Sequence, residues 1–163
     1  MKKFFVVLMI VCTAGSSTLY AQEMKKRMSL GNIGVGFVPG IGLNASYDYG
    51  LVDTWGPGIF TIGGFAGFHH CGGSSGLGNY RETAFAFAPR ATYRYAINEA
   101  FEVYATAMLG GILYSYSKHL NNKSDIFFGT TAGCRYTFSQ NLSLFGEIGY
   151  NISFLNGGLS ISF

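Results

Sequence analysis

The sequence contains few charged residues. Asp, Glu, Lys and Arg make up only 12% of its 163 residues, about half of the share that is typical of a soluble domain. The formal net charge is +3, and Lys2 and Lys3 contribute two of these charges. Because the remaining sequence has no basic cluster apart from residues 25–27, it argues against a nucleic-acid-binding protein.

Cysteines and long apolar runs are also scarce. Of the three cysteines, Cys12 lies in a segment that we expect to be removed, and Cys71 and Cys134 fall at different depths of the predicted fold. We therefore expect no structural disulfide. Beyond residue 21 no apolar stretch approaches the roughly 20 residues of a membrane-spanning helix, although 48% of the chain is hydrophobic. These features favour either a soluble all-β fold, such as a sandwich, or a barrel whose apolar face meets lipid.

The N-terminus has the pattern of a secretory signal peptide. Two lysines precede an apolar run over residues 4–11, and small residues follow it. We expect cleavage after Ala21, which makes residues 1–21 the signal peptide. Residues 22–28 then form a short periplasmic tail, and residues 29–163 form a single domain.

Eight segments of the domain alternate between apolar and polar residues with the period of a β-strand. They cover residues 30–38, 41–52, 58–69, 82–96, 100–116, 125–138, 142–152 and 157–163. Short turns alternate with longer connections, of which residues 71–81 and 117–124 are the most polar. An even number of such segments, most of them at least as long as the roughly 9 to 11 residues of a membrane strand, predicts an eight-stranded antiparallel up-and-down transmembrane β-barrel.

The two faces of these segments differ in chemistry. In residues 41–52, Leu43 and Tyr47 share one face while Asp48 lies on the other. Segment 58–69 is apolar or glycine on both faces, so its faces stay unassigned. All six charges in the middle parts of the strands fall opposite the apolar face: Asp48, Arg90, Arg94, Glu102, Arg135 and Glu147. A charge in contact with the middle of the bilayer costs roughly 2 to 4 kcal/mol, so we expect all six in the lumen.

These lumen charges sum to zero, which predicts a network of ion pairs. Antiparallel hairpins place Arg94 opposite Glu102 and Arg135 close to Glu147. An unpaired charge would be costly in a lumen that contains little water. An eight-stranded barrel is only wide enough for its own side chains, so we expect a plugged lumen without a general diffusion channel.

Three pieces of the domain resemble a known family: GNIGVGF, NEAFEVYATAMLGG and FSQNLSLFGEIGYNISFLNGGLSISF. They are similar to the small outer-membrane β-barrel proteins of the OmpX, OmpA-barrel and opacity-protein type. The resemblance implies a barrel in the outer membrane of a Gram-negative bacterium, surrounded by outer-membrane lipid. It also implies that Phe163, after alternating Leu159 and Ile161, is the signal that the outer-membrane assembly machinery reads. We expect a monomer.

No residue pattern indicates catalysis, a cofactor or a metal. His69, His70 and Cys71 are adjacent, but neighbouring residues of a strand point to opposite faces and cannot easily share a metal ion. The family includes adhesins, structural barrels, small pores and a few lipid-modifying enzymes, so activity does not follow from the fold. We expect a structural or cell-surface interaction role without enzymatic activity and with an unknown surface ligand. A small pore and, less favoured, a lipid-modifying enzyme that uses His70 and Ser74 are the alternatives.

Overall fold

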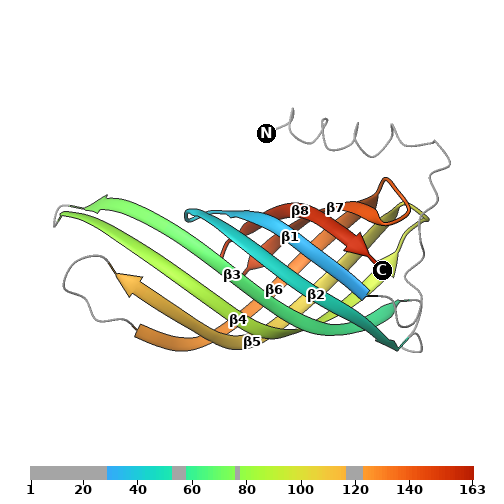
Figure 1. Ribbon diagram of the computed structural model, residues 1–163, viewed down its shortest axis with the longest axis horizontal. Helices are drawn as coiled ribbons and strands as arrows, with labels where there is room; N and C mark the ends of the chain where they lie inside the picture. Colours follow the sequence, from blue (N-terminus) through green and yellow to red (C-terminus); the bar gives the residue numbers. More distant parts are fainter. Residues whose placement is uncertain (1–28, 53–57, 76–77, 117–122) are drawn as a thin grey trace.

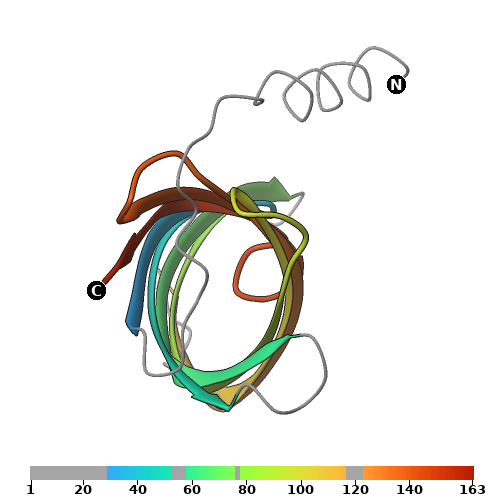
Figure 2. The ribbon, with the colours of Figure 1, turned by 90° about the vertical axis from the view of Figure 1, so that its right-hand side faces the viewer.

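Eight β-strands form one closed barrel (Figures 1 and 2). The computed structural model describes residues 29–52, 58–75, 78–116 and 123–163. The strands are β1 (Ser29–Phe37), β2 (Ile41–Val52), β3 (Ile59–Ser75), β4 (Gly78–Ala96), β5 (Phe101–Tyr116), β6 (Lys123–Thr137), β7 (Leu142–Tyr150) and β8 (Leu155–Ser162). Each strand pairs antiparallel with the next, and β8 pairs with β1. The predicted eight-stranded antiparallel barrel is confirmed, and a sandwich of two stacked sheets is excluded.

The described part of the chain contains no helix of the length and apolar character needed to cross a membrane.

The barrel closes where its two end strands meet. Ser29 and Phe163 exchange backbone hydrogen bonds of 3.0 and 3.1 Å, and the ladder continues through pairs such as Ile33 with Leu159. The end that holds both of these terminal residues is called the terminal end, and the opposite end is called the loop end. The β4–β5 turn at the terminal end is held by Asn98, whose Oδ1 accepts hydrogen bonds from two backbone N–H groups at 2.8 and 2.9 Å.

Side chains alternate between an apolar outer face and a mixed lumen. On the outer face Ile33, Leu43 and Leu109 expose 59 to 68% of their surface. In the lumen Asp48 and Arg94 are at most 1% exposed. The alternation also settles β3, because Thr61, Phe65, Gly67 and His69 are buried while Ile62, Ala66, Phe68 and His70 are exposed.

The lumen has two levels, which follow the order of residues along β4. Ala84, Ala86 and Ala88 lie toward the loop end and belong to an apolar cluster. Arg90 and Arg94 lie toward the terminal end and belong to the charged level. The other members of the apolar cluster are Phe65, Met108, Ile112, Phe127 and Ile152, and the rings of Phe65 and Phe127 stack with centroids 6.2 Å apart.

The β7–β8 connection enters the barrel. Figure 2 shows this red-orange turn inside the ring of strands. Ile152 and Ser153 expose only 8% and 1% of their surface, and Ile152 packs in the apolar cluster. The turn therefore fills part of the lumen from the loop end.

Several predicted boundaries were wrong. The expected polar loop over residues 71–81 is largely a hairpin, because β3 and β4 stay paired from Cys71 with Glu82 to Ser75 with Gly78. Glycine and serine have low strand propensity, but the paired backbone ladder outweighs that preference. β7 ends at Tyr150, so Ile152 lies in the inward turn and not in a strand. The predicted signal peptide and periplasmic tail, residues 1–28, lie outside the described residues.

Candidate functional site

The strongest concentration of charge in the barrel is centred on Asp48. Its Oδ2 lies 2.8 Å from Nη2 of Arg94, and its Oδ1 lies 3.1 Å from Nε of Arg90. Both arginines belong to β4, whereas Asp48 belongs to β2, so these contacts cross β3. Gly63 of β3 is paired with Asp48 on one side and with Arg90 on the other. Gly63 therefore lies between the two paired residues in the sheet, and a Cβ there would meet the backbone of Tyr47 and Asp48.

A second carboxylate, Glu102 of β5, joins two more guanidinium groups. Its Oε1 lies 2.9 Å from Nη1 of Arg94 and 2.6 Å from Nη1 of Arg135. The Arg94 contact is the one that the β4–β5 hairpin predicts. The Arg135 contact follows from the register, in which Glu102 is directly paired with Arg135. Arg94 therefore bridges Asp48 and Glu102 into one continuous chain of charges.

Glu147 enters the cluster through Arg90 and Tyr104. Its Oε1 is 3.6 Å from Nη2 of Arg90 and accepts a 3.0 Å hydrogen bond from the Tyr104 hydroxyl. Guanidinium groups of Arg94 and Arg135 lie 5.4 and 5.1 Å from the centre of the Tyr104 ring, within the range of cation–π attraction.

One predicted ion pair is absent. No salt bridge joins Arg135 and Glu147 among the described residues. The register explains this, because β6 places Gly133 opposite Glu147 and Arg135 opposite Phe145. Arg135 contacts Glu102 instead.

Neutral side chains add further hydrogen bonds to the cluster. Asn32 donates to Oδ2 of Asp48 at 3.3 Å and accepts from Nη2 of Arg135 at 3.2 Å. Ser160 accepts from Nε of Arg135 at 3.1 Å and donates to Oδ1 of Asn32 at 2.6 Å. Strands β1 and β8 are thereby joined to the same network, which the charge pattern alone did not reveal.

The six predicted lumen residues thus form one neutral network. It connects five of the eight strands through its charged side chains, and β1 and β8 through Asn32 and Ser160. Three carboxylates and three guanidinium groups are paired there, with no nucleophile among them. All are buried except Glu102, whose side chain is 16% exposed. A network of this kind is costly to break at any one member, because the partner keeps a buried charge. The arrangement ties these strands together across the charged level of the lumen.

The histidines lie near the loop end on opposite faces. His69 points into the lumen, and His70 points outward, where its Nδ1 is 3.1 Å from Oγ1 of Thr83. The Cys71 thiol donates a 3.4 Å hydrogen bond to the carbonyl of Pro39. The described residues contain no group of three His, Cys, Asp or Glu that could hold a metal ion. The side chain of Ser74 and the whole of His119 lie outside the described parts of the chain.

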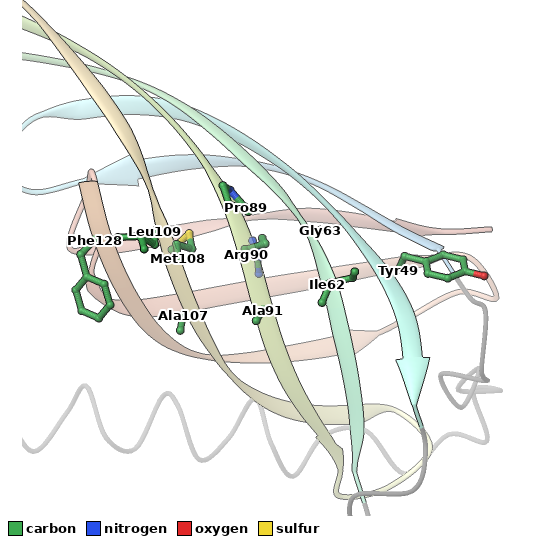
Figure 3. A pocket seen from close by; sticks show the side chains of 10 residues that line it. All are labelled: Tyr49, Ile62, Gly63, Pro89, Arg90, Ala91, Ala107, Met108, Leu109 and Phe128. Carbon is green, nitrogen blue, oxygen red and sulfur yellow. The ribbon is translucent and has the colours of Figure 1, made fainter. Parts of the chain in front are cut away.

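A depression of about 600 Å³ lies on the outer face over β3, β4 and β5. Figure 3 shows its lining along adjacent strands, with Ile62, Ala91 and Ala107 on three successive strands. Pro89 lies at its edge and has no N–H group to donate, and the paired residues of β4 and β5 skip Ala88 and Pro89. The depression therefore reflects small side chains and a gap in the ladder within the apolar face.

Comparisons with known proteins identify the fold. No known protein family and no curated protein matches the sequence. The structure is similar to a barrel described as a de novo designed transmembrane β-barrel, with a TM-score of 0.57 and 16% identity over 87% of this chain and 100% of that one.

Two natural barrels are similar as well. The N-terminal β-barrel domain of Pseudomonas aeruginosa OprF has a TM-score of 0.53 and 15% identity over 85% of this chain and 98% of that one. Ail, the attachment invasion locus protein of Yersinia pestis, solved in complex with the heparin analogue sucrose octasulfate, has a TM-score of 0.51 and 14% identity over 83% of this chain and 95% of that one. At these identities the likeness establishes the barrel fold.

Proposed function

We propose that this protein is a monomeric barrel in the outer membrane of a Gram-negative bacterium, with a structural role or a role in interactions at the cell surface. Two facts support the membrane location. The outer face carries exposed large apolar side chains on every strand from β1 to β8. The fold of the chain is similar to that of a designed transmembrane barrel. The likeness to an attachment protein supports a surface role.

The observation that carries the proposal is that side chains occupy the lumen at two levels. The charged network occupies the terminal end, and the apolar cluster with Ile152 occupies the level above it. Met108 and Phe127 in this upper level are 3% and 6% exposed. A solute would have to displace both levels, so a structural or surface role is favoured over transport.

Conductance in planar bilayers tests this proposal. The folded protein should insert and show no single-channel steps above the baseline. Slower migration of the boiled sample in detergent gels would show that the protein was folded, and fractionation of cells should recover it with the outer membrane. Reproducible steps from a folded sample, or recovery of the mature chain in the soluble fraction, would overturn the proposal.

The proposal includes an assembly signal at Phe163. Its ring packs on the outer face beside Gly31, and its backbone closes the seam with Ser29. Replacing Phe163 by Ser should lower the folded fraction in the outer membrane. Replacing its neighbour Ser162, whose side chain faces the lumen, by Ala should not. Equal folded fractions for the two variants would contradict the assignment.

The proposal also excludes a lipid-modifying reaction. Mass spectra of membrane lipids should be unchanged when the protein is overexpressed. A modified lipid that disappears on replacement of His70 by Ala would show that the enzymatic alternative is correct.

A further inference from the structure

A pocket of about 350 Å³ opens at the loop end of the lumen, above the apolar cluster. Phe127, Ile112 and Ile152 of that cluster also line the pocket. The pocket is bounded further by β3 and β4, through His69 and Glu82. Its volume is at the lower end of the range for small-molecule sites.

Two polar groups in this pocket have no hydrogen-bond partner in the described structure. They are Nε2 of His69 and Nδ2 of Asn151. His69 exposes only 5% of its surface, and both residues line the pocket. Buried polar atoms are almost always hydrogen-bonded, so the two atoms call for a molecule that supplies the partners.

The charge of the pocket indicates which kind of molecule this is. Glu82 is the only acidic or basic residue besides histidine among the lining residues. No Lys or Arg of the described chain forms a salt bridge with it. Lys123 and Asp125 near this end of the barrel pair with each other at 2.9 Å. Glu82 therefore places at the mouth of the lumen a negative charge that no salt bridge among the described residues neutralises.

Aromatic side chains stand beside this carboxylate. Tyr114 faces the lumen one pair away from Glu82, since Tyr114 is paired with Ala84 and Glu82 with Tyr116. The ring of Tyr114 packs against the apolar cluster to which Phe127 belongs. A carboxylate beside aromatic rings in a pocket is the arrangement that attracts ammonium groups through charge and cation–π interactions.

We propose that this pocket binds a small organic ammonium ion. The ammonium group lies near Glu82 and Tyr114, and the apolar part of the ligand rests on Phe127 and Ile152. A polar group of the ligand accepts a hydrogen bond from Asn151. The site is a property of the folded barrel, so it can be present even if the proposed outer-membrane role is wrong.

The test uses the full chain, folded in a maltoside detergent, because a detergent with an ammonium head group would compete. Choline and ethanolamine are the probes, and 3,3-dimethylbutan-1-ol is the neutral analogue of choline. Calorimetric titration should show saturable binding of at least one amine, and the neutral analogue should bind about tenfold more weakly or not at all.

Two variants locate the site. Glu82→Gln should weaken amine binding by about tenfold. Glu99→Gln makes the same change in the β4–β5 turn at the terminal end and should leave the affinity unchanged. Heat-dependent gel migration checks that both variants are folded.

Three results would overturn the proposal. They are the absence of saturable binding of both amines up to roughly 50 mM, equal binding of choline and its neutral analogue, and equal affinities of the Glu82→Gln variant and the unmodified protein. In each case water alone would satisfy His69 and Asn151. None of these results would bear on the conductance test, so the failure of one proposal is distinguishable from the failure of the other.

Discussion

Replacing Asp48 by Asn tests the lumen network at its centre. Asp48 is fully buried and contacts both Arg90 and Arg94. The amide has the same shape as the carboxylate, so packing is retained while one negative charge is lost. Three guanidinium groups then share the two carboxylates of Glu102 and Glu147.

The size of the effect follows from what remains around each arginine. Arg94 keeps the 2.9 Å contact with Glu102, but Arg135 already uses the same oxygen. Arg90 keeps the 3.6 Å salt bridge with Glu147 and its hydrogen bonds to the neutral hydroxyls of Thr92 and Thr106. Removal of one partner from a buried ion pair typically costs about 3 to 5 kcal/mol. We expect the Asp48→Asn variant to lose about this much of its free energy of unfolding.

Urea titration of the protein folded in phospholipid vesicles measures this loss. The folded fraction is read from gel migration without boiling, and the free energy of unfolding is extrapolated to zero urea. Asp125→Asn is the matched control, because its pair with Lys123 is 52 to 64% exposed and its loss should leave the free energy of unfolding almost unchanged.

A double variant separates charge balance from packing. Adding Arg90→Gln to Asp48→Asn restores a neutral cluster, so the double variant should lose less than the sum of the two single losses. A loss of less than about 1 kcal/mol for Asp48→Asn alone, or strictly additive losses, would refute the view that these charges act as one network.

Two further pairs of variants probe packing and the outer face. Gly133→Ala places a Cβ 2.5 Å from the Tyr104 ring, whereas the Cβ of Gly146→Ala meets nothing within 4 Å. Urea titration should show that the free energy of unfolding falls by about 1 to 3 kcal/mol for the first variant and changes little for the second. Equal losses would contradict the role of packing around Tyr104. Leu109→Arg, on the outer face, should cost roughly 2 to 4 kcal/mol in vesicles. Ser115→Arg, on the same face of β5 but near the loop end, should cost much less, and similar costs would argue against a lipid-facing band.

The alternation of faces was the part of the fold most accessible from the sequence. A strand has only two faces, so one charged residue such as Asp48 or Glu147 determines the orientation of the whole strand. Both residues point into the lumen, as do Arg94 and Arg135. The hairpin contact between Arg94 and Glu102 was equally accessible, because it depends only on local register.

Contacts across the lumen were not accessible in this way. The pairing of Asp48 with Arg90 spans two strand boundaries and depends on Gly63 at the position between them. The sequence of segment 58–69 does not show which face of β3 points into the lumen, since both faces are apolar or glycine. Only the closed barrel shows that Phe65 stacks on Phe127 inside it.

The inward β7–β8 turn was missed for a related reason. Ile152 continues the apolar alternation of β7, so its sequence reads as an outward strand residue. Its neighbour in the fold is the apolar cluster, which no local pattern contains. The unpartnered His69 and Asn151 near this turn were likewise invisible, because the pocket exists only once the turn has folded inward.

Oxygen accessibility of spin labels on three successive residues of β5 is the most direct test of the account. Ala105 and Ala107 point outward and Thr106 is 4% exposed in the lumen. Each is replaced by Cys in a Cys71→Ser and Cys134→Ala background, labelled, and measured in phospholipid vesicles. We predict high oxygen accessibility at 105 and 107 and low accessibility at 106. Uniform accessibility along the three positions, or preferential contact of 105 and 107 with a water-soluble relaxation agent, would contradict a barrel whose outer face lies in lipid.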